Sequence, residues 1–367
     1  MDIEQLAFTY SNFYVPVFEI EVEGENIIEK GVEVVSVNVD NTLKNADHFT
    51  FIVNNAFDIM EKEVRWLDQL FTFGKKVKVK MGYANQSGEI SELVEIFIGL
   101  ITSVTTRFPS GGLPQMEVSG YDLSHCMMKG LKSRSWERAK HSDIARDIAN
   151  YYKLKSVIHD TGVLFPKVVK KDGISDFQFL QDLAKKNAFE FFVFCETLYF
   201  RAPDFDKKPI VTLEWGKSLV SFNPEINVAN LVTKVEVRGW DAVNKKVFIG
   251  KAKLEDLLGR NDKKNQKNIG EMVQQMCKES IELSVQYPVF SQQEADKLAK
   301  SILKKHTEGL VTGSGETIGI PKILAGENIL LLGLGKKFSK KYYIEQSNHS
   351  FSSSGYRTTF NIKENII

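Results

Sequence analysis

The sequence predicts a β-rich α+β fold, and three observations point to it. Apolar and polar residues alternate with a period of two in the first 120 residues, helix signals appear in residues 121–204, and alternating segments return after residue 205. A period of two indicates strands that bury one face, whereas apolar residues three or four positions apart indicate helices. Short strands separated by turns favour an antiparallel barrel or sandwich on each side of an α+β insert.

The length and charge of the chain limit the classes of protein to which it can belong. At about 150 residues per domain, its 367 residues predict two or three domains. Lys and Arg total 48 and Asp and Glu total 47, so the chain lacks the basic excess of a nucleic-acid coat. No apolar run reaches the roughly 18 residues that span a bilayer. Residues 1–14 contain Asp2 and Glu4 but no basic residue, unlike a signal peptide. We expect a soluble protein made in the cytoplasm.

The first 120 residues predict several strands. Alternating segments stand at residues 35–40, 76–81 and 96–108, and another strand begins at Met116. Residues 109–112 (Pro-Ser-Gly-Gly) form a turn signal between the segment at 96–108 and the strand that begins at Met116. Residues 58–70 are mixed in character and predict a short helix.

The following segments predict an α+β unit and one later helix. Ser142 and Asp143 can cap a helix, and Ser175 with Gln178 forms a capping box before a second helix. Residues 188–200 then predict a β-hairpin. A further capping box at residues 291–294 opens the clearest helix of the chain, after a polar loop at residues 259–268.

The cysteines and histidines form no catalytic or metal-binding pattern. Cys126, Cys195 and Cys277 are odd in number and far apart, which argues against a disulfide framework or a CxxC metal site. Cys195 follows an apolar run, where a buried and inert thiol is expected. The histidines show neither HExxH nor His-x-His spacing. They are His48, His125, His141, His159, His306 and His349. We therefore expect no metal site.

Other motifs give no active site either. The sequence Gly333-Leu334-Gly335 lacks the third glycine of a dinucleotide loop, and no GxSxG elbow is present. Three carboxylates lie beside turns or helix starts, where capping of backbone N–H groups explains them. These are Asp40, Asp122 and Asp176. The sequence thus predicts no catalytic residues and no cofactor.

One lysine pattern is a candidate for function. Lys76, Lys78 and Lys80 alternate with apolar residues and therefore share one strand face. Such a stripe could line a channel or meet an acidic partner. A solvated strand face, or an edge that lysine protects from aggregation, explains the pattern equally well.

Two groups of segments resemble a known family in their order and spacing. The first group is Gly120-Tyr121-Asp122 with residues 123–125, then residues 142–149, 175–184 and 198–201. The second group is residues 317–321, 325–329, 333–335, 338–339, 342–344 and 355–360, with His349. Together they resemble the phage late control gene D family, the baseplate hub of contractile tails, which is related to the hub portion of VgrG.

The resemblance implies a fold, an assembly and partners. It implies two similar antiparallel β-barrel domains, an inserted small α+β domain and a helical segment, forming a homotrimeric ring with pseudo-sixfold symmetry. The domains would be residues 1–120, an insert at 121–204, a second barrel from 205–250 and 310–367, and a helical segment at 251–309. The ring would adapt a hexameric tail tube protein to a separate trimeric spike protein and contact tape-measure or baseplate proteins, within a virion or an extracellular injection particle.

The hub interpretation predicts no catalysis, no specific nucleic-acid binding and no membrane span. Subunits would bind through edge strands and apolar faces, and the near-zero net charge suits a conduit that does not grip what passes through it. Lys76, Lys78 and Lys80 would face the lumen or an interface. Two alternatives stay open: a tail-associated cell-wall-degrading enzyme, and a carbohydrate-binding adhesin with exposed tryptophan platforms.

Overall fold

The computed structural model describes most of the chain and bears out the β-rich fold. The described residues are 1–227, 229, 232–241, 245–253, 282–286, 289, 291–307 and 311–364. The predicted polar loop at 259–268 and Cys277 lie outside these residues.

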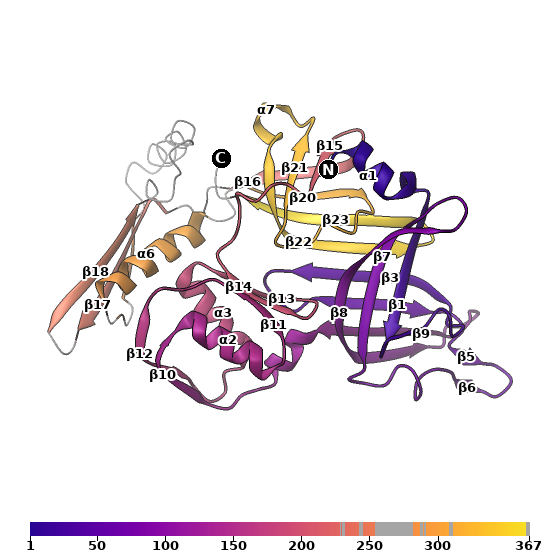
Figure 1. Ribbon diagram of the computed structural model, residues 1–367, viewed down its shortest axis with the longest axis horizontal. Helices are drawn as coiled ribbons and strands as arrows, with labels where there is room; N and C mark the ends of the chain where they lie inside the picture. The colour runs from indigo at the N-terminus through magenta and orange to yellow at the C-terminus, as the bar shows by residue number, and fades with distance from the viewer. Residues whose placement is uncertain are drawn as a thin grey trace.

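A single sheet of 13 strands forms the body of the molecule (Figure 1). Its order is β16-β20-β23-β22-β3-β4-β9-β8-β7-β1-β2, and β21 pairs with both β15 and β22. The pairing is antiparallel except between β15 and β21. The strands are β1 (Val15–Val22), β2 (Glu25–Asn26), β3 (Val34–Thr42), β4 (His48–Val53), β7 (Lys76–Ala84), β8 (Ile90–Arg107), β9 (Gln115–Asp122), β15 (Val211–Glu214), β16 (Leu219–Ile226), β20 (Val311–Ile318), β21 (Asn328–Leu332), β22 (Lys341–Ser352) and β23 (Gly355–Glu364).

The strand pair β3–β22 joins the N-terminal and C-terminal parts of this sheet. Residues 37–42 of β3 pair with residues 346–351 of β22. One continuous hydrophobic core extends across the pair and includes Leu6, Phe49, Val211 and Phe360. Both predicted β regions therefore share one sheet and one core, and the division into two barrel domains remains a prediction.

The predicted alternation explains the strands of the N-terminal region. In β7, Val77, Val79 and Met81 are buried while the intervening lysines lie on the opposite face. The helix expected at residues 58–70 is wrong. That stretch contains parts of a small hairpin of β5 (Phe57–Asp58) and β6 (Glu63–Val64), because the Asp58 carboxylate accepts hydrogen bonds from the backbone of Met60 and Glu61 and closes a turn.

The α+β unit has its own core and forms from a continuous stretch of chain (Figure 1). Three strands, β11, β14 and β13, form one sheet, and β10 and β12 form another. Its elements are η2 (Leu123–Met128), β10 (Arg134–Lys140), α2 (His141–Tyr151), β11 (Lys155–Ile158), β12 (Leu164–Lys170), α3 (Asp176–Asn187), β13 (Glu190–Phe194) and β14 (Thr197–Arg201). The predicted hairpin is β13–β14.

The helix signals of this unit act nearly as predicted. Ser175 is the N-cap of α3, and its hydroxyl accepts a hydrogen bond from the Gln178 backbone at 3.1 Å. Helix α2 begins at His141, ahead of the predicted cap, because the Asp143 carboxylate accepts from the backbone of Lys140 at 3.0 Å.

A third group of elements packs around α6 (Gln292–Thr307), on the left of Figure 1. Strands β17 (Lys234–Asp241), β18 (Lys246–Lys253) and β19 (Glu282–Gln286) form its sheet. Ser291 caps α6 as predicted, since its hydroxyl accepts from the Glu294 backbone at 3.1 Å. Thus, within the range predicted for the second barrel, β15 and β16 join the large sheet while β17 and most of β18 lie in this separate sheet.

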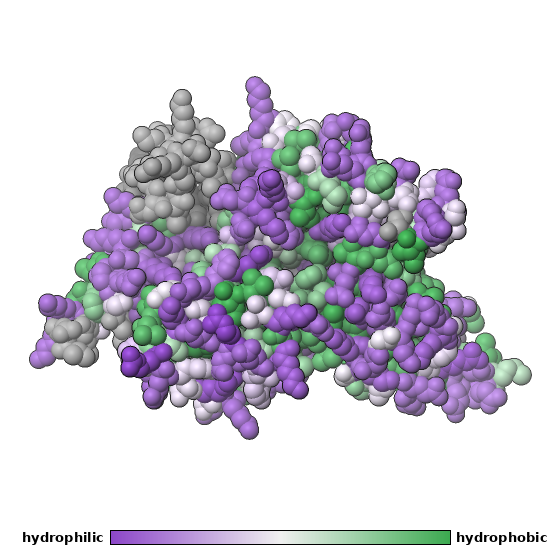
Figure 2. All heavy atoms as spheres, in the orientation of Figure 1, coloured by the Kyte–Doolittle hydropathy of each residue, from purple (hydrophilic) through white to green (hydrophobic). Residues whose placement is uncertain are grey.

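Short helices close the ends of the large sheet. The N-terminal α1 (Ile3–Thr9) and η1 (Ser11–Phe13) bring Leu6 and Tyr10 into the main core. A short helix, α7 (Gly335–Phe338), begins at the last glycine of the Gly333-Leu334-Gly335 motif. None of the helices in the described ranges has the length and apolar character of a membrane span. Hydrophilic side chains cover much of the face in Figure 2, and apolar ones gather near the middle of its right half.

Candidate functional site

The lysine stripe lies on the outer face of the large sheet, as the alternation predicted. Lys76, Lys78 and Lys80 alternate along β7 with residues of the main core. Strand β7 lies between β1 and β8, so the lysines face side chains from both neighbours. Strand β7 is therefore an inner strand of the sheet. Protection of a sheet edge from aggregation does not explain its lysines.

Carboxylates from neighbouring segments meet every lysine of the stripe. Lys80 Nζ lies 2.8 Å from Glu19 Oε1 and 2.5 Å from Glu21 Oε1 on β1. Lys78 lies 3.7 Å from Glu21 and 3.4 Å from Glu95 on β8. Lys76 forms an ion pair with a further glutamate, Glu196, in the β13–β14 turn of the α+β unit.

These pairs change the chemistry that the stripe can perform. Hydrogen bonds to Glu19 and Glu21 raise the pKa of Lys80, and the hydrogen bond from Lys80 lowers the pKa of Glu21. Both shifts keep Lys80 and Glu21 charged near neutral pH, and opposite charges alternate across three strands. The stripe is thus a balanced surface rather than a uniformly basic one, a property that the sequence of β7 alone does not reveal.

A groove of about 1000 Å³ separates α3 from α6 and reaches the large sheet. Hydrogen bonds fix its walls: Gln181 of α3 donates to the backbone oxygen of Lys44 at 2.6 Å, and the Ser301 hydroxyl of α6 donates to the backbone oxygen of Lys185. Its described lining includes seven lysines and three carboxylates. These are Lys44, Lys171, Lys185, Lys186, Lys304, Lys305 and Lys363, with Asp182, Glu190 and Glu345. The sequence does not predict this groove, because α3 and α6 are separated by more than 100 residues along the chain.

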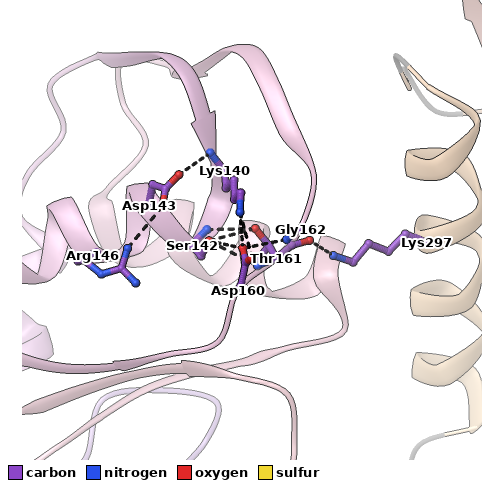
Figure 3. A network of polar contacts seen from close by, with 8 residues as sticks. All are labelled: Lys140, Ser142, Asp143, Arg146, Asp160, Thr161, Gly162 and Lys297. Carbon is purple, nitrogen blue, oxygen red and sulfur yellow. Dashed lines mark hydrogen bonds and ion pairs between the residues drawn. The ribbon is translucent and has the colours of Figure 1, made fainter.

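A polar network joins the α+β unit to α6 beside this groove (Figure 3). Lys297 of α6 donates to the backbone oxygen of Thr161 at 2.5 Å. The neighbouring Asp160 accepts from Lys140 at 3.0 Å and from the Gly162 backbone at 3.0 Å. The two units are therefore tied through a loop whose conformation the Asp160 carboxylate fixes.

His141 lies next to this network in a cavity of about 20 Å³, large enough for one water molecule. Its Nδ1 accepts a hydrogen bond from the Asn187 amide at 2.8 Å, so the proton of the neutral ring sits on Nε2. Burial, with Lys186 and Lys297 nearby, lowers the pKa of His141 to about 4. The imidazole is thus neutral at neutral pH and serves packing.

The Gly-Tyr-Asp motif forms a buried junction between the large sheet and the α+β unit. Asp122 caps η2 and accepts from the Asp47 backbone at 2.9 Å, while Asp47 accepts from the Thr42 backbone at 2.7 Å. Burial raises the pKa of Asp122 to about 6, and burial beside Asp122 also raises the pKa of Asp47. A Cβ at Gly120 would lie 1.9 Å from the Leu100 backbone oxygen, so the motif requires glycine there.

Of the three carboxylates expected to cap turns or helices, Asp40, Asp122 and Asp176, only Asp122 does so. Asp176 forms an ion pair with Lys170 at 2.6 Å, in which both side chains are buried. Asp40 lies within β3 and accepts from the Asn348 amide at 2.7 Å. Both carboxylates are explained by tertiary contacts that local sequence signals do not contain.

The C-terminal motif forms a second buried network. His349 Nε2 lies 2.9 Å from the Ile323 backbone oxygen, so Nε2 is the donor and Nδ1 accepts from the Tyr356 hydroxyl at 2.8 Å. Burial lowers the pKa of His349 to about 4. A Cβ at Gly319 would lie 2.1 Å from the Tyr356 ring. This part of the motif is therefore required for core packing.

The cysteines occupy unrelated positions in the described structure. Cys195 is partly buried in the β13–β14 turn, where burial raises the pKa of its thiol, as an inert thiol requires. Cys126 is exposed and follows His125 in a 3₁₀ helix. Within the described ranges, no three His, Cys, Asp or Glu side chains are grouped to hold a metal ion.

Exposed apolar residues and sheet ends are further candidate contact surfaces. Trp240 and Val247 pair across β17 and β18 and are 58% and 54% exposed. Trp215 is 59% exposed, whereas the other two tryptophans contact the cores. At the ends of the large sheet, Pro16 in β1 and Pro224 in β16 each remove a backbone donor. Apolar faces therefore suit association better than these strand edges.

Comparison with solved structures shows the fold of phage tail proteins. The chain resembles a 43 kDa tail protein of prophage MuSo2 from Shewanella oneidensis, with a TM-score of 0.71, 12% identity and coverage of 95% of this chain and 98% of that one. A tail protein of Neisseria meningitidis gives a TM-score of 0.66 and 15% identity, covering 96% of this chain and 97% of that one. A chain of the Francisella PdpA–VgrG complex gives 0.54 and 13%, covering 99% and 61%.

Sequence comparison adds a family. No curated protein matches the chain. The family described as the Alg8 N-terminal domain matches residues 13–353. That match covers nearly the whole chain, so the chain belongs to the Alg8 N-terminal domain family.

Proposed function

We propose that the protein is a structural baseplate hub of a contractile phage tail or a phage-tail-like injection particle. The observation that carries this proposal is the end-to-end likeness to proteins described as tail proteins, at 95% or more of both chains. As a late control gene D-type hub, it would form a homotrimeric ring between a hexameric tube and a separate trimeric spike.

The balanced lysine stripe suits the wall of such a ring. Uniformly basic walls would retain nucleic acid or acidic polypeptides, whereas alternating charges offer no continuous field of one sign. Lys76, Lys78 and Lys80 with Glu19 and Glu21 would then face the lumen, where tape-measure protein or cargo lies. Charge reversal of the three lysines is expected to lower particle yield or delivery. Unchanged yield and delivery would remove the stripe from this role.

The mass of the purified protein in solution tests the assembly. A ring predicts about 125 kDa by light scattering, three times the 41.6 kDa chain, and binding to the cognate tube or spike protein. A monomer that binds neither protein would contradict the hub proposal. We also propose that the protein has no catalytic activity, so the purified chain should not clear a suspension of bacterial cell walls.

The adhesin alternative draws on two exposed tryptophans, Trp215 and Trp240. Exposed aromatic rings serve protein interfaces as well as ligand stacking. If the chain binds immobilised glycans and a Trp215→Ala/Trp240→Ala variant loses that binding, the adhesin function replaces the hub function. Loss of trimer in the variant, without glycan binding by the native chain, supports the hub.

A further inference from the structure

The groove between α3 and α6 combines an apolar floor with charged rims. Ten apolar side chains larger than alanine line it, of which Phe189, Val285 and Ile302 are partly exposed. The ten are Leu43, Val169, Ile174, Phe179, Leu183, Phe189, Phe191, Val285, Leu298 and Ile302. Apolar side chains exposed in a concavity gain free energy when a partner removes water from them.

Lysines outnumber carboxylates in the described lining of the groove. The three carboxylates of the lining already have lysine partners: Glu345 lies 2.9 Å from Lys44, Asp182 lies 3.8 Å from Lys185, and Glu190 lies 3.9 Å from Lys363. Seven lysines thus face three carboxylates. Lys185 and Lys305 are exposed and stand on opposite helices, in the last turns of α3 and α6.

The combination selects one class of partner. A phosphate backbone would gain from the lysines, but it would gain nothing from the apolar floor and would meet the three carboxylates. A small molecule would fill only part of a groove of about 1000 Å³ whose lining comes from the large sheet, α3 and α6. An amphipathic segment has both features, with an apolar stripe for the floor and acidic side chains for the rims.

We propose that this groove binds an acidic, amphipathic segment of a partner protein. The proposal rests on the lining and charge of the groove and holds whether or not the chain forms a hub. Association would be steered by the lysines and would weaken as salt screens them.

Fluorescence anisotropy tests this with the full chain and a labelled 15-residue peptide that places leucine and glutamate on opposite helical faces. A scrambled peptide of the same composition and a 15-nucleotide oligo-dT are the comparison probes. We expect the amphipathic peptide to bind at least about tenfold more tightly than the scrambled one, and less tightly in 0.5 M NaCl. Equal binding of the two peptides, no binding of either, or tighter binding of the oligonucleotide would each overturn the proposal.

A double variant locates the binding. Lys185→Glu/Lys305→Glu reverses one charge on each rim and should weaken peptide binding about tenfold or more. The matched control is Lys336→Glu/Lys337→Glu, because these lysines are also exposed in the last turn of a helix but lie on α7. Should the first variant lose its helical circular dichroism, Lys185→Gln/Lys305→Gln replaces it, with a loss of at least about threefold expected. Equal binding by the folded test variant and the control would refute the assignment.

Discussion

The large sheet and the α+β unit are held together in different ways. The main core joins residues from Leu6 to Ile362, and its strands pair across more than 300 residues at β3 and β22. The α+β unit instead closes its core within residues 127–200 and contains the buried Lys170–Asp176 ion pair. One region depends on distant apolar contacts, and the other on local elements with a charged centre.

This difference has consequences for how each region fails. Because the core of the large sheet is continuous, damage at its C-terminal end should reach its N-terminal strands. Damage inside the α+β unit should stay there, since the unit has its own core.

Removing a core ring tests the continuity of the large sheet. Phe360 on β23 is 2% exposed and packs over Gly315 of β20. Phe360→Ala should cost about 4 kcal/mol of unfolding free energy, since it leaves a cavity in a packed core. Hydrogen exchange should then speed up in β4 and β9 as well as in β20. Phe8→Ala, at a side chain that is 91% exposed, is the control and should change little.

The same measurement tests the predicted barrel boundary. If only β20, β22 and β23 lose amide protection in Phe360→Ala, the two β regions are independent domains. The continuous core would then not couple the stability of one region to that of the other.

Breaking the buried ion pair tests the independence of the α+β unit. Lys170 and Asp176 have side-chain exposures of 1% and 5%, and their charged atoms lie 2.6 Å apart. Lys170→Met leaves a buried carboxylate without its cation and should cost about 3 kcal/mol. Amide protection should fall in α2 and α3 but not in β4.

A second substitution provides the control for that experiment. Lys170→Met/Asp176→Asn removes the uncompensated charge and should recover at least half of the lost stability, as chemical denaturation would show. If the double variant is as unstable as the single one, the cost comes from packing and not from charge.

The two regions also differ in how far the sequence predicted them. Capping residues and hairpin spacing act over a few positions, so α3 and the β13–β14 hairpin of the α+β unit were predicted correctly, as was α6 outside both regions. Strand alternation likewise predicted β7. The β3–β22 pairing depends on which distant strand lies alongside, and no local pattern encodes that choice. The hairpin at β5–β6 was mistaken for a helix because Asp58 directs its turn through backbone contacts.

The candidate sites follow the same rule. The lysine face of β7 was predictable from its period of two, but the glutamates that balance it come from β1, β8 and the β13–β14 turn. The α3–α6 groove was not predictable, because its two rims belong to helices more than 100 residues apart. Sequence patterns thus predict which side chains share one face of a strand or helix. They do not identify the distant residues that contact that face.

Acid should weaken the large sheet through His349. Its pKa is about 4 when folded against 6.5 for an exposed histidine, so the unfolded chain binds the proton more tightly between these values. The contribution is fully present above pH 6.5 and is lost as pH falls to 4, which amounts to about 2 to 3 kcal/mol. Asp122, with a pKa raised to about 6, acts in the opposite direction and gains stability as pH falls through that value.

Substitution of His349 separates its contribution to the pH dependence of stability from that of Asp122. The stability advantage of the native chain over His349→Gln should shrink by about 2 kcal/mol between pH 7 and pH 4, while Asp122 contributes equally to both proteins. His159→Gln, at an exposed histidine, is the matched control. A constant difference between native chain and His349→Gln across this range would show that the buried imidazole does not control acid sensitivity.

The smallest effect is expected at the lysine stripe, on the outer face of the large sheet. Glu21→Gln removes the carboxylate shared by Lys78 and Lys80 and should cost about 1 kcal/mol or less in low salt. Because exposed ion pairs are screened, the difference from the native chain should nearly disappear in 1 M NaCl. Glu61→Gln in the β5–β6 turn is the control. A loss above about 2 kcal/mol that persists in high salt would mean that charge pairing, and not the shared apolar core, holds β1 and β7 together, and the contrast with the α+β unit would fail.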